Sequence, residues 1–93
     1  MDIIILGQPI TILAMVIQPN VYNNPTGIVI FKSADKTLGV VPIDDNGYAT
    51  LTINSNILGV GEHTITVFYP GDKNNAATMS PAIRKIIVPV AKI

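Results

Sequence analysis

Hydrophobic and polar side chains alternate along several short segments of this chain, and turn-forming residues separate the segments. The clearest segment runs from Gly61 to Tyr69 and ends in the turn sequence Pro70-Gly71-Asp72. Its period of two places Ile65, Val67 and Tyr69 on one face of an extended strand. A strand that packs one face on a core has this pattern, and Pro, Gly and Asp mark where it ends.

Six other segments follow the same rule. The predicted strands cover residues 3–6, 10–17, 27–32, 38–43, 48–53, 61–69 and 84–90. Asp44-Asp45-Asn46-Gly47 predicts a hairpin turn, because Asn-Gly adopts the positive φ angles that such turns require. Pro42 and Pro89 favour a sheet edge or a strand end. Residues 18–25 and 70–81 are predicted loops, and no segment has a helical period. Seven short strands at this spacing predict an all-β, antiparallel sandwich, and the length predicts one domain over residues 1–93.

The alternation also predicts which side chains form the core. The expected inward positions are Ile10, Ile12, Ala14, Val16, Val29, Phe31, Ala49, Leu51, Ile53, Ile65, Val67 and Tyr69.

Charge is scarce in this sequence. Charged residues make up 13% of the 93 residues, against about 25% in average proteins, and the formal net charge is zero. No basic field exists to attract nucleic acid, so we exclude nucleic acid as a partner. We also expect no membrane insertion, because no segment approaches the ~20 apolar residues that cross a bilayer. The chain has no cysteine, which excludes disulfides and thiolate sites.

The sequence predicts no catalytic site and no cofactor. His63 is the only histidine, and its neighbour Glu62 points to the opposite face of the same strand. A general base needs an orienting acid and a nucleophile within hydrogen-bond reach, and the sequence pairs His63 with neither. No serine lies in a nucleophile motif, and no phosphate loop is present. We therefore expect a protein that is not an enzyme.

We also predict no metal site. Asp44 and Asp45 are explained by turn chemistry, and Asp72 belongs to the turn after Tyr69. Calcium requires six to eight oxygen ligands, commonly several of them from one loop. A calcium-dependent or carbohydrate-binding site would use these three acids or the tyrosines Tyr22 and Tyr48.

An ordered set of motifs covers nearly the whole chain. Its elements are Pro25-Thr26-Gly27-Ile28-Val29-Ile30-Phe31, Leu38-Gly39, Asn46-Gly47-Tyr48-Ala49-Thr50-Leu51, Gly61-Glu62-His63-Thr64-Ile65 and Tyr69-Pro70-Gly71-Asp72. This set resembles the bacterial immunoglobulin-like repeat family, which occurs in tandem in surface and adhesin proteins and on phage virions. The resemblance implies a seven-strand Ig-like β-sandwich that serves as a spacer, display or adhesion module, usually without catalysis. It also implies that His63 packs at the start of a strand.

Apolar side chains occupy positions that should face solvent. Ile28, Ile30 and Phe68 point outward if their neighbours face the core, and the family's fold places their two strands side by side. Leu13 and Met15 should be exposed on the opposite sheet. Monomers rarely leave such patches in water unless they serve an interface, so these five residues are our candidate interface. The alternative is that loops or chain ends cover them.

The sequence thus predicts a non-catalytic structural or interaction module, displayed extracellularly on a virion or a cell surface, that mediates assembly, decoration or attachment. Its expected partners are proteins, either copies of itself or a larger assembly, with host-surface glycans as a further candidate. The alternative is a carbohydrate- or calcium-dependent ligand-binding module of a secreted adhesin. The start of the chain lacks the basic region of a signal peptide. Two settings therefore remain open, a complete virion-decorating protein and a repeat excised from an adhesin.

Overall fold

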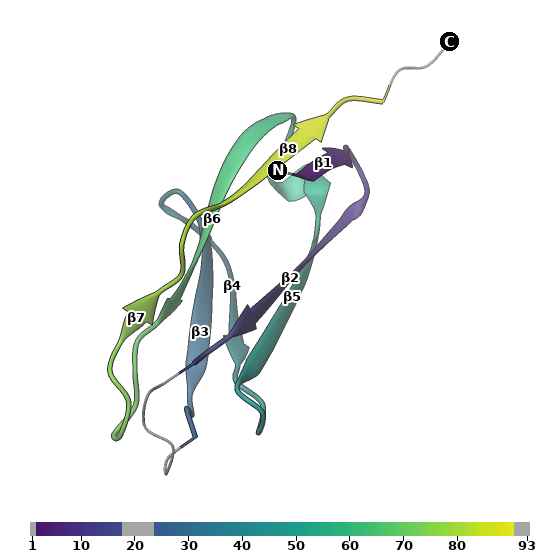
Figure 1. The fold of residues 1–93 in the computed structure, drawn as a ribbon. Helices are drawn as coiled ribbons and strands as arrows, with labels where there is room; N and C mark the ends of the chain where they lie inside the picture. The colour runs from purple at the N-terminus through teal and green to yellow at the C-terminus, as the bar shows by residue number, and fades with distance from the viewer. Residues whose placement is uncertain (1, 18–23, 91–93) are drawn as a thin grey trace.

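The computed structural model describes residues 2–17 and 24–90, which form a two-layered β-sandwich (Figure 1). Its elements in chain order are β1 (Asp2–Ile5), β2 (Pro9–Met15), β3 (Ile28–Ser33), β4 (Lys36–Pro42), β5 (Tyr48–Asn54), the 3₁₀ helix η1 (Ser55–Ile57), β6 (Gly61–Tyr69), β7 (Thr78–Met79) and β8 (Ile83–Val88).

The strands form two sheets of unequal size. The larger sheet has the order β1-β8-β6-β3-β4, with β7 also paired to β6, and the smaller sheet contains β2 and β5. Among the described strands, all pairs are antiparallel except that of β1 with β8, which is parallel. The predicted all-β sandwich is confirmed. The edge position predicted from Pro42 is also correct, because β4 is the last strand of the larger sheet.

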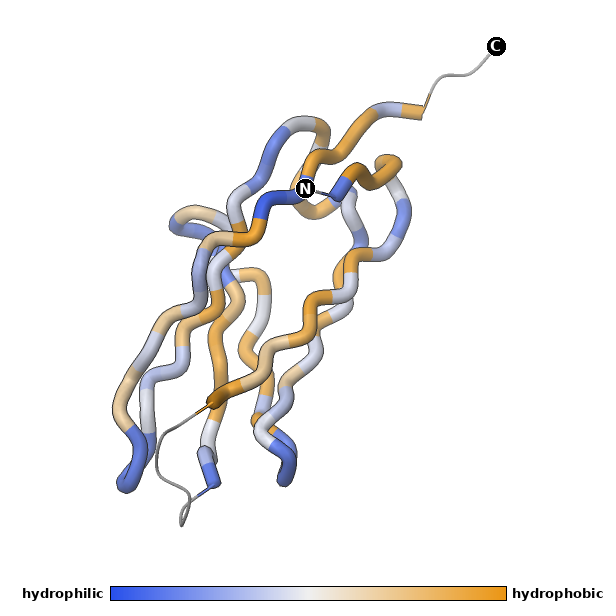
Figure 2. Tube along the Cα trace, viewed as in Figure 1, coloured by the Kyte–Doolittle hydropathy of each residue, from blue (hydrophilic) through white to orange (hydrophobic). Residues whose placement is uncertain are grey.

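The core lies between the two sheets and contains the inward side chains of both. Val29, Phe31 and Ile65 have no exposed surface, and Ile12 closes the core from the smaller sheet. Figure 2 shows hydrophobic residues along the strands and hydrophilic residues in the turns that join β4 to β5 and β6 to β7. The period of two therefore assigned the core faces correctly.

Two predicted core residues are only half-buried. Val16 lies just after the last residue of β2, where the sheet ends. Leu51 packs over Gly39 on the edge strand β4 and so covers the rim of the core.

The predicted loop over residues 70–81 contains a short strand. β7 has two residues, and its pairs are Phe68 with Met79 and Tyr69 with Thr78. The pairing continues in a bond from the Ser80 N–H to the Val67 carbonyl, 2.8 Å long. Two residues are too few to show a period in the sequence, so the strand could not be predicted.

Candidate interaction surfaces

A row of apolar side chains crosses the outer face of the larger sheet. Ile30 on β3 pairs with Val40 on β4 and with Phe68 on β6, and Phe68 pairs with Met79 on β7. Directly opposite residues of antiparallel strands project to the same face, about 5 Å apart. Val40 and Met79 at the two ends of the row are 56% and 59% exposed. We call these four residues the outer row.

The structure brings the predicted patch together in part. Ile30 and Phe68 are direct cross-strand neighbours, and Ile28 lies one step along the same face of β3, opposite Pro42. All three residues are half-buried rather than fully exposed, because side chains on adjacent strands cover part of each one. Sequence reasoning missed Val40 and Met79, which extend the patch.

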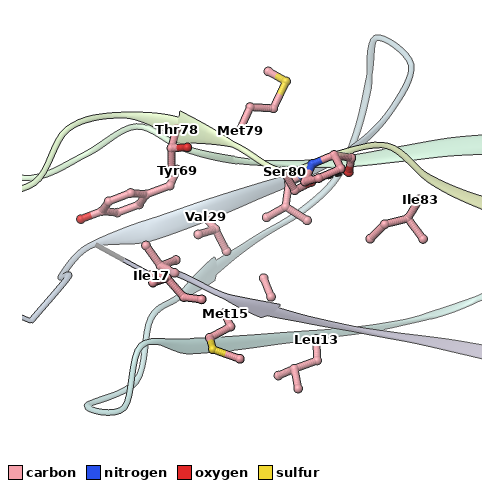
Figure 3. Close-up of a pocket in the computed structure, with 13 residues that line it drawn as sticks. Leu13, Met15, Ile17, Val29, Tyr69, Thr78, Met79, Ser80 and Ile83 are labelled. Atoms are coloured by element: carbon pink, nitrogen blue, oxygen red, sulfur yellow. Dashed lines mark hydrogen bonds between the residues drawn. The ribbon is translucent and has the colours of Figure 1, made fainter. Parts of the chain in front are cut away.

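Leu13 and Met15 lie on the other sheet, as expected, and are 60% and 54% exposed. They line an open groove of about 280 Å³ between the end of β2 and the Thr78–Ile83 segment (Figure 3). Its lining is mainly apolar and includes Val29, Val67 and Tyr69. The Ser80 hydroxyl at its wall is already engaged, accepting from the Val67 N–H and donating to the Pro81 carbonyl at 2.9 Å each. The groove therefore offers apolar contact rather than the convergent polar groups that fix a sugar.

His63 has a structural partner. Its Nε2 lies 2.8 Å from the carbonyl oxygen of Gly59, at the turn that leads into β6. The ring is half-buried, and its cross-strand neighbour on β8 is Lys85. This contact stabilises the start of the strand.

The acids between β4 and β5 are arranged for a turn, but the predicted hairpin is wrong, because β4 and β5 lie in different sheets and do not pair. One carboxylate oxygen of Asp44 accepts the backbone N–H groups of Asn46 and Tyr48, both at 2.9 Å. The Gly47 N–H closes the turn on the Asp44 carbonyl at 3.0 Å. Asp44 and Asp45 also line a second pocket, of about 280 Å³, together with Thr26.

Asp72 organises the corner where β6 ends. One of its carboxylate oxygens accepts from the N–H and hydroxyl of Thr26, at 2.8 and 2.9 Å. The other accepts from the N–H groups of Asn74 and Asn75, at 2.7 and 2.6 Å, and the Asn75 side-chain amide donates to both oxygens. Tyr69 completes the set by donating its hydroxyl to the Thr26 carbonyl at 2.9 Å. We call these five residues the Asp72 corner.

The hydrogen bonds of the Asp72 corner favour the ionised form of the Asp72 carboxyl group. Desolvation alone would raise the pKa of Asp72, but the bonds from Thr26, Asn75 and Asn74 together hold that pKa well below its ordinary value. Burial raises the pKa of Tyr69, and its interaction with Asp72 raises it further. Asp72 is therefore a fixed anionic acceptor whose oxygens are occupied by protein donors.

The acids that a calcium-binding alternative would use do not form a cluster. Asp44 and Asp45 lie on one side of the Thr26 segment, and Asp72 binds Thr26 with both of its oxygens already engaged. Within residues 2–17 and 24–90, no three His, Cys, Asp or Glu side chains are placed to hold a metal ion. Tyr48 is half-buried at the end of the turn between β4 and β5, and Tyr22 lies outside the described residues.

A buried serine fastens the crossing from β1 to β2. The Ser55 hydroxyl accepts from the Gly7 N–H at 2.8 Å and lies 3.3 Å from the Ile5 carbonyl, to which it donates. The Ser55 N–H donates to the Gln8 carbonyl at 3.0 Å, and the Asn54 amide donates to the Gly7 carbonyl at 3.0 Å. Ser55 has no exposed surface. We call these five residues the Ser55 hub, which sequence reasoning missed.

An ion pair joins the first and last strands. Lys85 lies on the inward face of β8, is 9% exposed, and binds the carboxylate of Asp2 on β1. The hydrogen bond and the charge of Lys85 lower the pKa of Asp2. The only signal in the sequence is the position of Lys85 between the inward residues Ile83 and Ile87.

The family model for the bacterial Ig-like domain (group 3) matches residues 3–88. The chain belongs to this family. The match covers every strand from β1 to β8 except the first residue of β1, and it agrees with the two-sheet sandwich. Ig-like domains of this kind are generally non-catalytic structural or interaction modules.

Comparisons with curated proteins and with solved structures gave no match. In the described part of this Ig-like domain, no helix has the length and apolar character needed to span a membrane.

Proposed function

We propose that this Ig-like domain is a non-catalytic module displayed on a virion or a cell surface, where it mediates assembly, decoration or attachment through protein contacts. The observation that carries the proposal is the outer row, which continues across four strands of the larger sheet. An apolar row of this kind suits a partner surface of the same character. Copies of this domain and an apolar face of a larger assembly both meet that description.

Burial of the outer row against a partner would help to hold a tethered module in place. Burial of a few hundred Å² of apolar surface at about 25 cal/mol per Å² contributes several kcal/mol before association costs are subtracted. A domain that is already attached to an assembly loses less translational and rotational freedom on docking. The same contact between free domains would be weak.

Sedimentation of the purified domain at micromolar concentrations, combined with binding of an apolar dye, tests this proposal. We expect self-association or dye binding, and we expect Phe68→Thr to reduce it while the fold is retained. Val60→Thr is the matched control, because Val60 is 56% exposed and lies outside both the outer row and the groove that Leu13 and Met15 line. A clean monomer that binds no dye would contradict the proposal.

The alternative of calcium-dependent ligand binding rests on the pocket that Asp44 and Asp45 share with Thr26. Binding to the folded state would raise the melting temperature by mass action. We expect no change when calcium is added, because one oxygen of Asp44 and both oxygens of Asp72 already accept backbone hydrogen bonds. A rise in melting temperature that Asp45→Asn abolishes would favour the alternative.

A further inference from the structure

One edge of β2 is open. β2 pairs with β5 along its other edge, and no further strand in the described part of the chain pairs with it. Just past the end of β2, the Val16 N–H donates to the Gly47 carbonyl at 2.8 Å. Backbone groups alternate in direction along a strand, so every second residue back from Val16 also faces β5. The N–H and carbonyl groups of Thr11, Leu13 and Met15 therefore face the open edge.

This edge lacks the features that keep the other edges of the domain from pairing. Proteins protect strand edges with charge, proline, bulges or short length. The edge strand β4 contains Lys36 and Pro42, and its pairing with β3 shifts in register. The edge strand β1 has four residues and begins with the charged Asp2. The other edge of β5 lies beside β4, since Leu51 packs over Gly39. β2 has seven residues, an unbroken register with β5 and no charged side chain.

The surroundings of the open edge are apolar. The edge borders the groove between the end of β2 and the Thr78–Ile83 segment (Figure 3). Beside it, Leu13 and Met15 are more than half exposed, and Ile17 just beyond the strand is 75% exposed. A strand added at this edge would cover these side chains as well as the groove. The edge therefore suits an extended, uncharged segment, and β2 itself is such a segment.

A second copy of β2 fits this edge in an antiparallel register centred on Leu13. A two-fold axis at Leu13 places it opposite Leu13 of the second copy and places Thr11 opposite Met15. Opposite residues in such a pair exchange two hydrogen bonds, so every edge-facing N–H and carbonyl of these three residues gains a partner. Pro9, which has no N–H to donate, lies outside these central pairs. No like charges meet, because the paired side chains are uncharged and each copy has zero net charge.

We propose that β2 pairs antiparallel with β2 of a second copy, which joins the two-stranded sheets of both copies into one sheet of four strands. The contact lies on the smaller sheet, away from the outer row, so this inference goes beyond the proposed function. Seven residues at about 3.3 Å each give a shared ribbon about 23 Å long. A single strand contact of this length is at the small end of protein interfaces, so the dimer is reversible and forms when copies are concentrated.

Charge-swap variants at the two-fold axis test the pairing. Leu13→Lys and Leu13→Glu each place like charges opposite each other, whereas an equimolar mixture places opposite charges there. Leu13 is 60% exposed, so both variants should keep the fold, which circular dichroism checks. In sedimentation velocity from about 10 μM to about 1 mM, we expect the wild type to dimerise and each variant alone to bind itself at least about tenfold more weakly. The mixture should recover the dimer. A monomeric wild type, or a mixture that associates no better than its components, would overturn the pairing.

Controls separate this contact from the outer row. Val60→Lys and Val60→Glu are the matched charge variants, because Val60 is 56% exposed and lies outside β2 and the groove. They should leave the dimer unchanged. Phe68→Thr should leave the charge-swap effect at Leu13 intact. If Phe68→Thr abolishes all self-association and the Leu13 variants do not weaken it, the β2 pairing is refuted and the proposed function stands. The opposite pattern refutes the outer row and supports the β2 pairing.

Cysteine variants test the register. The chain has no cysteine, so Thr11→Cys and Met15→Cys each introduce a single thiol. In the proposed register Thr11 lies opposite Met15, with their Cα atoms about 5.5 Å apart, whereas two copies of Thr11 are more than about 13 Å apart. A short thiol-to-thiol reagent should therefore crosslink the mixture of the two variants faster than either variant alone. Equal rates in all three samples would contradict the proposed register.

Discussion

The Asp72 corner and the Ser55 hub do the same task with different chemistry. Each joins segments that are distant in sequence: Thr26 to Asp72 in one case, and Gly7 to Ser55 in the other. The corner uses a carboxylate that accepts bonds from a surface loop, whereas the hub uses a neutral hydroxyl with no exposed surface. A carboxylate can accept several strong bonds where solvent is near. A hydroxyl avoids the cost of burying a charge.

Alanine substitutions at Gly7 in the Ser55 hub and at Gly71 beside Asp72 should differ most clearly in their cost to stability. Gly7 and Gly71 both have positive φ, +98° and +91°, so alanine is strained at either position. A Cβ at Gly71 would also lie 2.8 Å from the Asn75 carbonyl oxygen, while a Cβ at Gly7 would meet nothing within 4 Å. We expect Gly71→Ala to cost more than about 2 kcal/mol and Gly7→Ala about 1–2 kcal/mol in urea unfolding. Equal costs would show that the backbone beside Asp72 shifts to make room for the added methyl group.

Asp72→Asn tests the role of the charge. The folded-state pKa of Asp72 is depressed, so its contribution to stability is fully present above the ordinary pKa of about 3.9 and is lost as pH falls below that value. We expect a clear loss of melting temperature at pH 7, because an amide group would present hydrogens to existing donors. The difference between variant and wild type should shrink below pH 4. A difference that stays constant across this range would mean that another group controls acid unfolding.

Ser55→Ala provides the neutral counterpart. It removes two part-buried hydrogen bonds, one from the Gly7 N–H and one to the Ile5 carbonyl, which together contribute about 1–3 kcal/mol. Each kcal/mol lowers the melting temperature of a domain this size by about 4–8 °C. The loss should be the same at pH 3 and pH 7, because no ionisable group is removed. Thr52→Ala, which loses only an exposed hydroxyl contact with Thr11, should change little.

Tyr69→Phe should have the smallest effect of the four. It removes one hydroxyl bond to the Thr26 carbonyl, worth about 1 kcal/mol. The folded-state pKa of Tyr69 is raised, so its contribution is present below pH 10 and is lost as pH rises further. Thermal melts between pH 8 and 11 should therefore show a decline in the wild type that is weaker in the variant. If the melting temperatures of the wild type and the variant fall equally as the pH rises, groups other than Tyr69 cause the loss of stability at high pH.

The sequence predicted the parts of this molecule that have a local period. Val29 and Phe31 face the core and Ile30 faces outward because strand side chains alternate. The neighbouring positions of Ile30 and Phe68 followed from the family's strand order. Whether these residues contact a partner stays a prediction.

The missed features depend on contacts that have no local pattern. Ser55 binds Gly7 and Ile5 across 48 and 50 residues, and a serine after a strand carries no sign of such partners. Met79 belongs to the outer row only because the two-residue strand β7 pairs with the end of β6. Lys85 was missed because of its charge, since an inward lysine becomes stable only when Asp2 is brought beside it.

The pairing of β1 with β8 also constrains how the chain can be made. Asp2 and Lys85 are 83 positions apart, so the first strand of this domain gains its partner only when the last strand of the domain has been made. Closing so long a loop is slow relative to forming the hairpin of β3 and β4. During synthesis the apolar segment Ile3-Ile4-Ile5 must therefore wait for its partner, and at that stage the nascent chain is most exposed to aggregation.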